Sequence, residues 1–131
     1  MSDLTGRELD AAVARELGWT EIRLHECADP FCWGGCPEGW IGMPPGERLR
    51  ELPAFSTDIA WAMRAYGVMH ERGWRIDSAF HSPVECSVTL WHAVHGFARA
   101  TVQPGGRSPD AVLAEAICRA ILAAGEAGRA E

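Results

Sequence analysis

Hydrophobic positions at helical spacing mark three segments of the chain. Apolar residues recurring every third or fourth position predict a first helix over 5–17. The same spacing predicts a second helix that Ser56 caps and that ends at Gly73. A third helix is expected over 108–124, because Ser-Pro-Asp is a typical helix start, and residues 125–131 are expected to fray.

Strict alternation of polar and apolar residues marks four strands. The segment 20–24 alternates so that Ile22 and Leu24 are expected to face inward. Three further segments alternate in the same way, with short turns between them, and are expected to form an antiparallel meander: 74–81, 84–92 and 97–103.

Both periodicities vanish over 25–55, which holds five prolines and five glycines. This stretch is expected to be one long irregular loop. Loops of that length inside compact domains are uncommon and usually have a function or local bracing. The loop and the start of the second helix are therefore the expected contact surface.

The order of these elements predicts an α+β fold. Strands with apolar residues on both faces need cover on both, so we expect an α/β/α sandwich with a mainly antiparallel sheet of about four strands and three main helices. A chain of 131 residues is of the size of one domain, here 1–131.

Charge and composition narrow the function classes. The net charge is −6 and the twelve basic residues are scattered arginines, which argues against general nucleic-acid binding. No apolar run is long enough to cross a membrane, and the chain lacks a secretory start, so we expect a cytoplasmic protein with free thiols.

Three segments resemble the signature segments of the phage ABA-sandwich domain family: TGRELDAAVARELGW, LPAFSTDIAWAM and AICRAIL. The resemblance spans residues 4–122. It implies an α-β-α sandwich encoded by bacteriophages or prophages, in a family of largely unassigned function. It implies no catalytic residues.

The stretch ECADPFCWGGCPEGW suggests a metal site. Four residues of the kinds that bind tetrahedral zinc lie close together, and a bound ion would brace a loop without a core of its own. The alternative is that the cysteines are small buried apolar residues, since their spacing does not match the tight knuckle of zinc ribbons. The candidate zinc ligands are His25, Cys27, Cys32 and Cys36.

Two tryptophans in the same loop, Trp33 and Trp40, are candidates for stacking on a flat ligand such as a nucleobase. The alternative is that they fold down over the sheet as anchors. The other four tryptophans lie on expected helices and strands, where packing explains them: Trp19, Trp61, Trp74 and Trp91.

The start of the second helix is a further candidate. Ser56, Thr57 and Asp58 lie where free backbone N–H groups bind an anion or a ligand carboxylate. Helix capping explains the same three residues, and Asp58 would repel an anion.

His92 and His95 form an HxxH pattern around a turn, and His81 lies on the neighbouring strand. Together they suggest a metal site or an acid–base pair, although the helical HExxH of a zincin is missing. Cys86 and Cys118 fall on apolar faces and are expected to be core thiols.

These patterns favour a non-enzymatic binding protein. The resemblance implies a phage or prophage accessory role, and by analogy we expect it to counteract host defence, either by binding a host protein or by sequestering a small nucleotide-like signal. An exposed edge strand within 84–103 favours a homodimer. The alternatives are an adaptor with a zinc-clamped loop and, from the histidines, a metal-dependent hydrolase or nuclease. Without the zinc site, no cofactor is expected.

Overall fold

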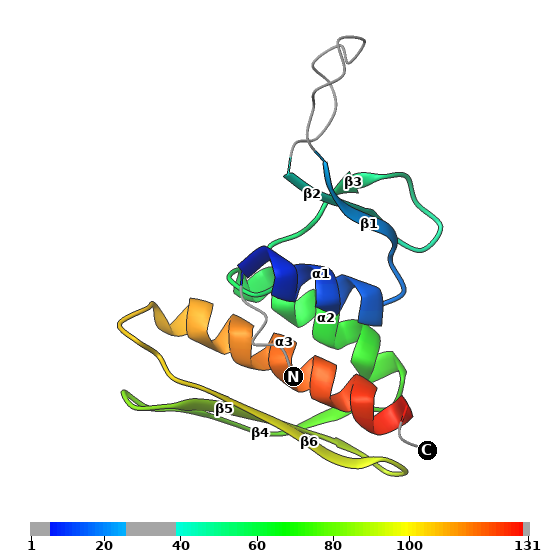
Figure 1. Ribbon diagram of the computed structural model, residues 1–131. Coiled ribbons are helices and arrows are strands. Elements are labelled where there is room, and N and C mark those ends of the chain that lie inside the picture. The colour runs from blue at the N-terminus through cyan, green and yellow to red at the C-terminus, as the bar shows by residue number, and fades with distance from the viewer. Residues whose placement is uncertain (1–5, 26–38, 130–131) are drawn as a thin grey trace.

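The computed structural model describes residues 6–25 and 39–129 (Figure 1). It confirms the α+β class and the three helices. The elements follow in the order α1 (Gly6–Glu16), β1 (Thr20–His25), β2 (Gly39–Met43), β3 (Arg50–Glu51), α2 (Ile59–Glu71), β4 (Arg75–His81), β5 (Cys86–His92), β6 (Gly96–Val102) and α3 (Pro109–Arg129).

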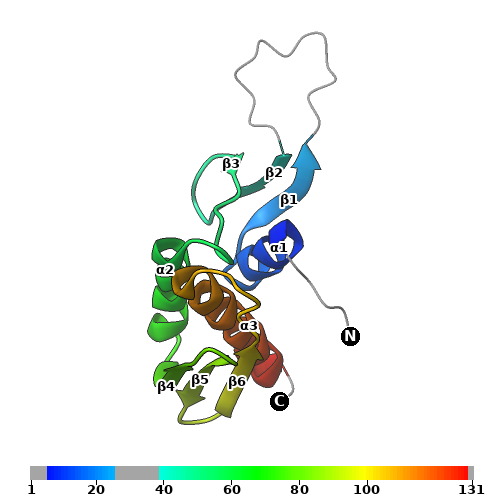
Figure 2. The same ribbon diagram turned by 90° about the vertical axis from the view of Figure 1, so that its left-hand side faces the viewer.

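The strands form two antiparallel sheets of three strands each, with orders β1-β2-β3 and β4-β5-β6. The helices lie between the two sheets, as both views show (Figures 1 and 2). The expected sandwich had a single sheet of about four strands. The arrangement differs because β1 pairs with β2, which the sequence did not reveal as a strand, and not with the meander.

The segment expected to be an irregular loop contains β2 and β3, so the prediction for 25–55 was wrong for its second half. Strand β2 has the sequence GWIGM, in which two glycines interrupt the alternation of polar and apolar residues that predicts a strand. A Cβ at Gly42 would lie 3.1 Å from the Ile22 side chain and 3.1 Å from the Trp19 indole. Gly42 therefore lets β2 pass close beneath these two side chains.

Strand β1 contains a bulge between Thr20 and Arg23, and Leu24 beyond it is exposed. Thr20 pairs with Met43 and Arg23 with Ile41, so two residues of β1 face Gly42, and Glu21 takes a φ of 56°. Ile22 packs against the core as predicted, but Leu24 is 53% exposed. The prediction was therefore right for Ile22 and wrong for Leu24, which pairs with Trp40 near the end of β1.

Two helices end in the same four-residue pattern, Glu-x-Gly-Trp. At the end of α2, Gly73 N–H donates to the His70 carbonyl and Trp74 N–H to the Met69 carbonyl, each at 3.0 Å. Gly18 and Trp19 make the corresponding bonds at the end of α1. This is the Schellman motif, in which a glycine with positive φ ends the helix and an apolar residue packs back on it.

At the start of α2 the cap is Asp58, whose side chain accepts from Ala60 N–H at 3.0 Å. Ser56, the expected cap, is buried two residues earlier. Met63 is 44% exposed, whereas Ala65 is buried. The buried face of α2 is therefore narrower than its apolar residues suggest.

Helix α3 continues to Arg129, so the expected fraying from residue 125 was wrong. Gly125 is buried against the Glu16 side chain, which a Cβ at this position would overlap. Glu16 in turn receives a bond from Arg129 Nη1 at 2.6 Å. The end of α3 is thus fixed to α1. The sequence does not reveal this contact, because a glycine at position 125 suggests the end of a helix.

The meander carries the core on one face. Cys86, Val88 and Leu90 are fully buried beneath α3, and Cys118 of α3 is buried too, which confirms both cysteines as core thiols. Burial raises the pKa of Cys86 and of Cys118. Within the part of the chain that the structure describes, no helix covers the other face, where the large side chains are Phe80, Trp91 and Phe97.

Glu115 joins α3 to the turn before it. It accepts from Arg107 and, at 2.8 Å, from Nε of Arg119. Burial by itself raises the pKa of Glu115, but hydrogen bonds from Arg107 and Arg119 and their charges bring the pKa below its ordinary value.

Replacing Glu115 by glutamine is expected to lower the free energy of unfolding by about 1 kcal/mol at pH 7. Because the pKa is lowered in the folded state, this stabilisation is present above the pKa of an unfolded glutamate, about 4.3, and is lost as the pH falls through the folded value. Urea unfolding of wild type and Glu115→Gln should therefore differ at pH 7 and differ less at pH 3. Glu47→Gln, at an exposed position, should match wild type at both pH values.

Candidate functional site

The described residues that were proposed for ligand binding do not form one site. Trp40 is half-buried and packs against the core, as an anchor does. Ser56 is buried, and its hydroxyl donates to the Gly6 carbonyl at 3.3 Å. Thr57 and Asp58 are exposed, and Asp58 is occupied as the cap of α2. Trp33 lies outside the described residues.

The zinc hypothesis stays a prediction. His25 is the last residue of β1, and the other three proposed ligands lie outside the described residues: Cys27, Cys32 and Cys36. Over 6–25 and 39–129, no group of three or more His, Cys, Asp or Glu side chains is placed to hold a metal ion.

His92 and His95 lie together, with ring centroids 4.4 Å apart, but His81 does not join them. His81 and His92 lie at opposite ends of the meander, beside Cys86 and Gly96 respectively. His92 Nε2 is 3.1 Å from the Arg72 carbonyl, so it donates, and Nδ1 accepts from the N–H groups of Val94 and His95. Both ring nitrogens of His92 are therefore used to brace a turn.

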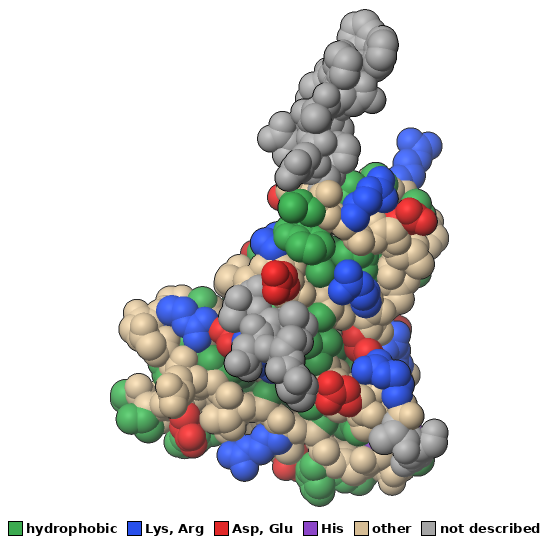
Figure 3. Space-filling view, in the orientation of Figure 1, with side chains coloured by type: hydrophobic (Ala, Val, Ile, Leu, Met, Phe, Trp, Pro, Cys, Tyr) green, Lys and Arg blue, Asp and Glu red, His purple; other side chains and the backbone are tan. Residues whose placement is uncertain are grey.

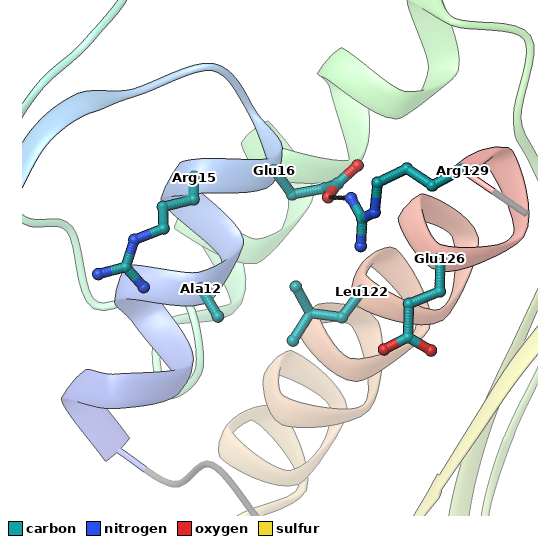
Figure 4. Close-up of a pocket in the computed structure, with 6 residues that line it drawn as sticks. All are labelled: Ala12, Arg15, Glu16, Leu122, Glu126 and Arg129. Carbon is teal, nitrogen blue, oxygen red and sulfur yellow. Dashed lines mark hydrogen bonds and ion pairs between the residues drawn. The ribbon is translucent and has the colours of Figure 1, made fainter. Parts of the chain in front are cut away.

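A hollow of about 370 Å³ lies between α1 and α3 (Figure 4). Ala12 and Leu122 line it, and Glu16 and Arg129 meet at one end. Figure 4 shows the side chain of Arg15 directed away from this pair.

Glu16 already has two basic partners. Arg129 lies at 2.6 Å and Arg72 at 3.9 Å, and Arg72 also donates to the Glu16 carbonyl at 2.9 Å. These residues belong to the C-terminal ends of α1, α2 and α3, where arginine also compensates the helix dipole. The hydrogen bond to Glu16 raises the pKa of Arg129. The cluster fastens three helix ends together and leaves its carboxylate little capacity for a ligand.

A second region, around Trp61 on α2, has a different character. The guanidinium carbon of Arg50 lies 5.7 Å from the centroid of the Trp61 ring, and that of Arg64 lies 4.8 Å away. Both distances fall within the range of cation–π contacts. We call Arg50, Trp61 and Arg64 the Trp61 surface.

Two hollows adjoin the Trp61 surface. The first, of about 230 Å³, lies beside β3 and has Arg7, Arg50 and Glu51 among its lining residues. The second, of about 140 Å³, is mainly apolar, and its lining includes Trp19 and Phe55. Trp61 contributes to both, and the Phe55 ring stands edge-on to it with the centroids 6.0 Å apart.

A buried carboxylate holds this region in place. Asp10 of α1 is 2% exposed, accepts from Ser56 N–H at 2.7 Å and pairs with Arg7 at 2.8 Å. Arg7 also donates to the carbonyls of Leu52 and Pro53. The network therefore fixes the segment between β3 and α2, which carries Phe55 into the core.

Several basic side chains of the described residues form ion pairs with acidic ones, but Arg50 and Arg64 do not. On the face shown in Figure 3, basic side chains lie among acidic and apolar ones and form no single basic patch. Arg7 is matched by Asp10, and Glu51 is the only carboxylate lining either hollow at Trp61 among the described residues. Arg50 and Arg64 make no ion pair with any described carboxylate.

Sequence reasoning missed this site because it assigned Trp61 to packing. One signal was present: Arg64 follows Trp61 by three positions, which places the two side chains together on a helix. Arg50 had no comparable signal, because its approach depends on β3, a strand of two residues.

No family model, curated protein or solved structure matches this chain. Across the described residues, no helix combines the length and the apolar character that crossing a bilayer requires.

Proposed function

We propose that this chain is a non-enzymatic binding domain that holds a small anionic molecule at the Trp61 surface. The observation that carries the proposal is the pair of guanidinium groups, Arg50 and Arg64, over one indole ring and without an ion-pair partner among the described residues. Arginine in such a position attracts carboxylates and phosphates and also stacks on planar groups.

The chemistry of these side chains supports binding rather than catalysis. Guanidinium stays protonated at neutral pH, and indole only donates a hydrogen bond. Neither group accepts a proton from a substrate. The surface therefore offers charge and ring contacts and lacks a general base of its own.

The resemblance to phage ABA-sandwich domains supports a phage or prophage setting for this proposal. In that setting the bound molecule would be a nucleotide-like signal of host defence, sequestered in the cytoplasm of the bacterial host. A nucleotide joins phosphate to a flat base, which matches arginine and tryptophan on one surface.

Native mass spectrometry of freshly purified protein, incubated with a small-molecule extract of bacterial cells, tests this proposal. Wild type is expected to retain an anionic small molecule that the Arg50→Ala, Arg64→Ala double variant loses. The Arg15→Ala, Arg99→Ala double variant has the same net charge and should retain it. Absence of any adduct on wild type, or equal retention by both double variants, would refute the proposal.

A further inference from the structure

Trp61 lines two hollows of different chemistry. The first holds polar groups of β3 and α1, including Arg50 and Arg7. The lining of the second is mainly aromatic and aliphatic, with Arg64 at its edge as the one charged residue among those described. A ligand that fills both hollows would therefore meet Arg50 in the first and mainly apolar surface in the second.

The apolar hollow has the size of a single ring. Its volume is about 140 Å³, and an apolar cavity of about 150 Å³ is known to take up benzene. Trp19, Phe55 and Trp61 form a run of edge-to-face contacts, with centroids 6.2 Å and 6.0 Å apart. Aromatic walls of this kind favour a flat guest, since rings pack well by offset stacking or edge-on.

The basic hollow suits one anionic group. Arg50 brings a charge that no described carboxylate neutralises in an ion pair, whereas the charge of Arg7 is compensated by Asp10. Glu51 lines the same hollow and opposes an anion there. The hollow is therefore weakly basic, and its affinity for an anion should depend on Glu51.

We propose that the ligand of the Trp61 surface has two joined parts: a phosphate or similar anionic group in the basic hollow and a single planar ring in the apolar hollow. A nucleoside monophosphate with a one-ring base carries both parts, joined through its ribose. The inference rests on the proposed function and makes it specific, because it requires both hollows to be filled by one molecule.

Isothermal titration calorimetry with uridine monophosphate, uridine and inorganic phosphate separates the two parts. Uridine monophosphate is expected to bind at least tenfold more tightly than either uridine or phosphate. The Glu51→Gln variant should bind phosphate and uridine monophosphate about threefold more tightly, because a like charge is removed. Its affinity for uridine should not change.

Two further variants address one hollow each. Arg50→Ala should weaken phosphate and uridine monophosphate binding about tenfold and leave uridine binding unchanged. Val68→Phe adds bulk to the apolar hollow and should weaken uridine and uridine monophosphate about tenfold while leaving phosphate binding unchanged. Glu51 and Arg50 are exposed, so their variants should fold. The measurements on these two variants test the inference even when Val68→Phe does not fold.

The outcomes distinguish this inference from the proposed function. Equal affinities for phosphate and uridine monophosphate would overturn the two-part ligand and leave anion binding intact. No binding of any of the three probes would overturn the two-part ligand as well. The proposed function then fails only when mass spectrometry also finds no retained anion.

Discussion

Replacing Asp10 by alanine is expected to lower the free energy of unfolding by about 3 to 5 kcal/mol, the range for removing one partner of a buried ion pair. The substitution leaves Ser56 N–H buried without its 2.7 Å acceptor and deprives Arg7 of its carboxylate. Urea denaturation followed by circular dichroism measures the change.

Glu8→Ala is the matched control, because Glu8 is an exposed acid on the same helix. It should cost less than about 1 kcal/mol, the scale of an acid in the first turn of a helix. A double-mutant cycle of Asp10→Ala with Arg7→Ala then isolates the coupling of the pair. An Asp10→Ala variant within 0.5 kcal/mol of wild type, on the order of a surface substitution, would contradict the bracing role.

Replacing Gly73 by alanine is expected to cost about 3 kcal/mol. About 1 kcal/mol comes from the positive φ of 97°, which a residue with a Cβ adopts unfavourably. The rest comes from overlap, because the new Cβ would lie 2.9 Å from His92 Nε2. The His92 ring cannot easily move away, since both its nitrogens are hydrogen-bonded.

Gly18 provides an unusually close control for this experiment. It holds the same position in the Schellman motif of α1, with a φ of 96°, and the nearest atom to a Cβ there is Pro45 Cγ at 3.4 Å. Gly18→Ala should therefore show the backbone cost alone, about 1 kcal/mol. Thermal unfolding of the two variants should differ accordingly, and equal losses would show that the His92 contact does not matter.

The fold was predictable from sequence wherever one local pattern decided the structure. The helix ends at Gly18 and Gly73 followed from glycine and spacing, and the meander followed from alternation and short turns. Prediction failed where a contact from elsewhere in the chain determined the outcome. Gly42 makes room for the side chains of Trp19 and Ile22, and Gly125 makes room for the carboxylate of Glu16. From sequence alone, Gly42 suggests a loop and Gly125 the end of a helix, because these partners lie elsewhere in the chain.

The candidate site was predictable only in its general position. The loop over 25–55 and the start of the second helix were expected to be the contact surface, and Arg50 and Trp61 fall within these two segments. The individual residues were not foreseen: Ser56 serves the Asp10 network, and Arg50 reaches Trp61 from a strand of two residues. Side chains that meet through tertiary packing leave no periodic signal.

Helix α3 has a consequence for how the protein is made. It packs against α1, α2, β5 and β6, yet it follows all of them in the chain. A nascent chain that has emerged from the ribosome only as far as residue 108 holds these elements without the helix that joins them. Its apolar faces stay uncovered until α3 follows, which makes the interval during synthesis the stage at which chaperones have most to shield.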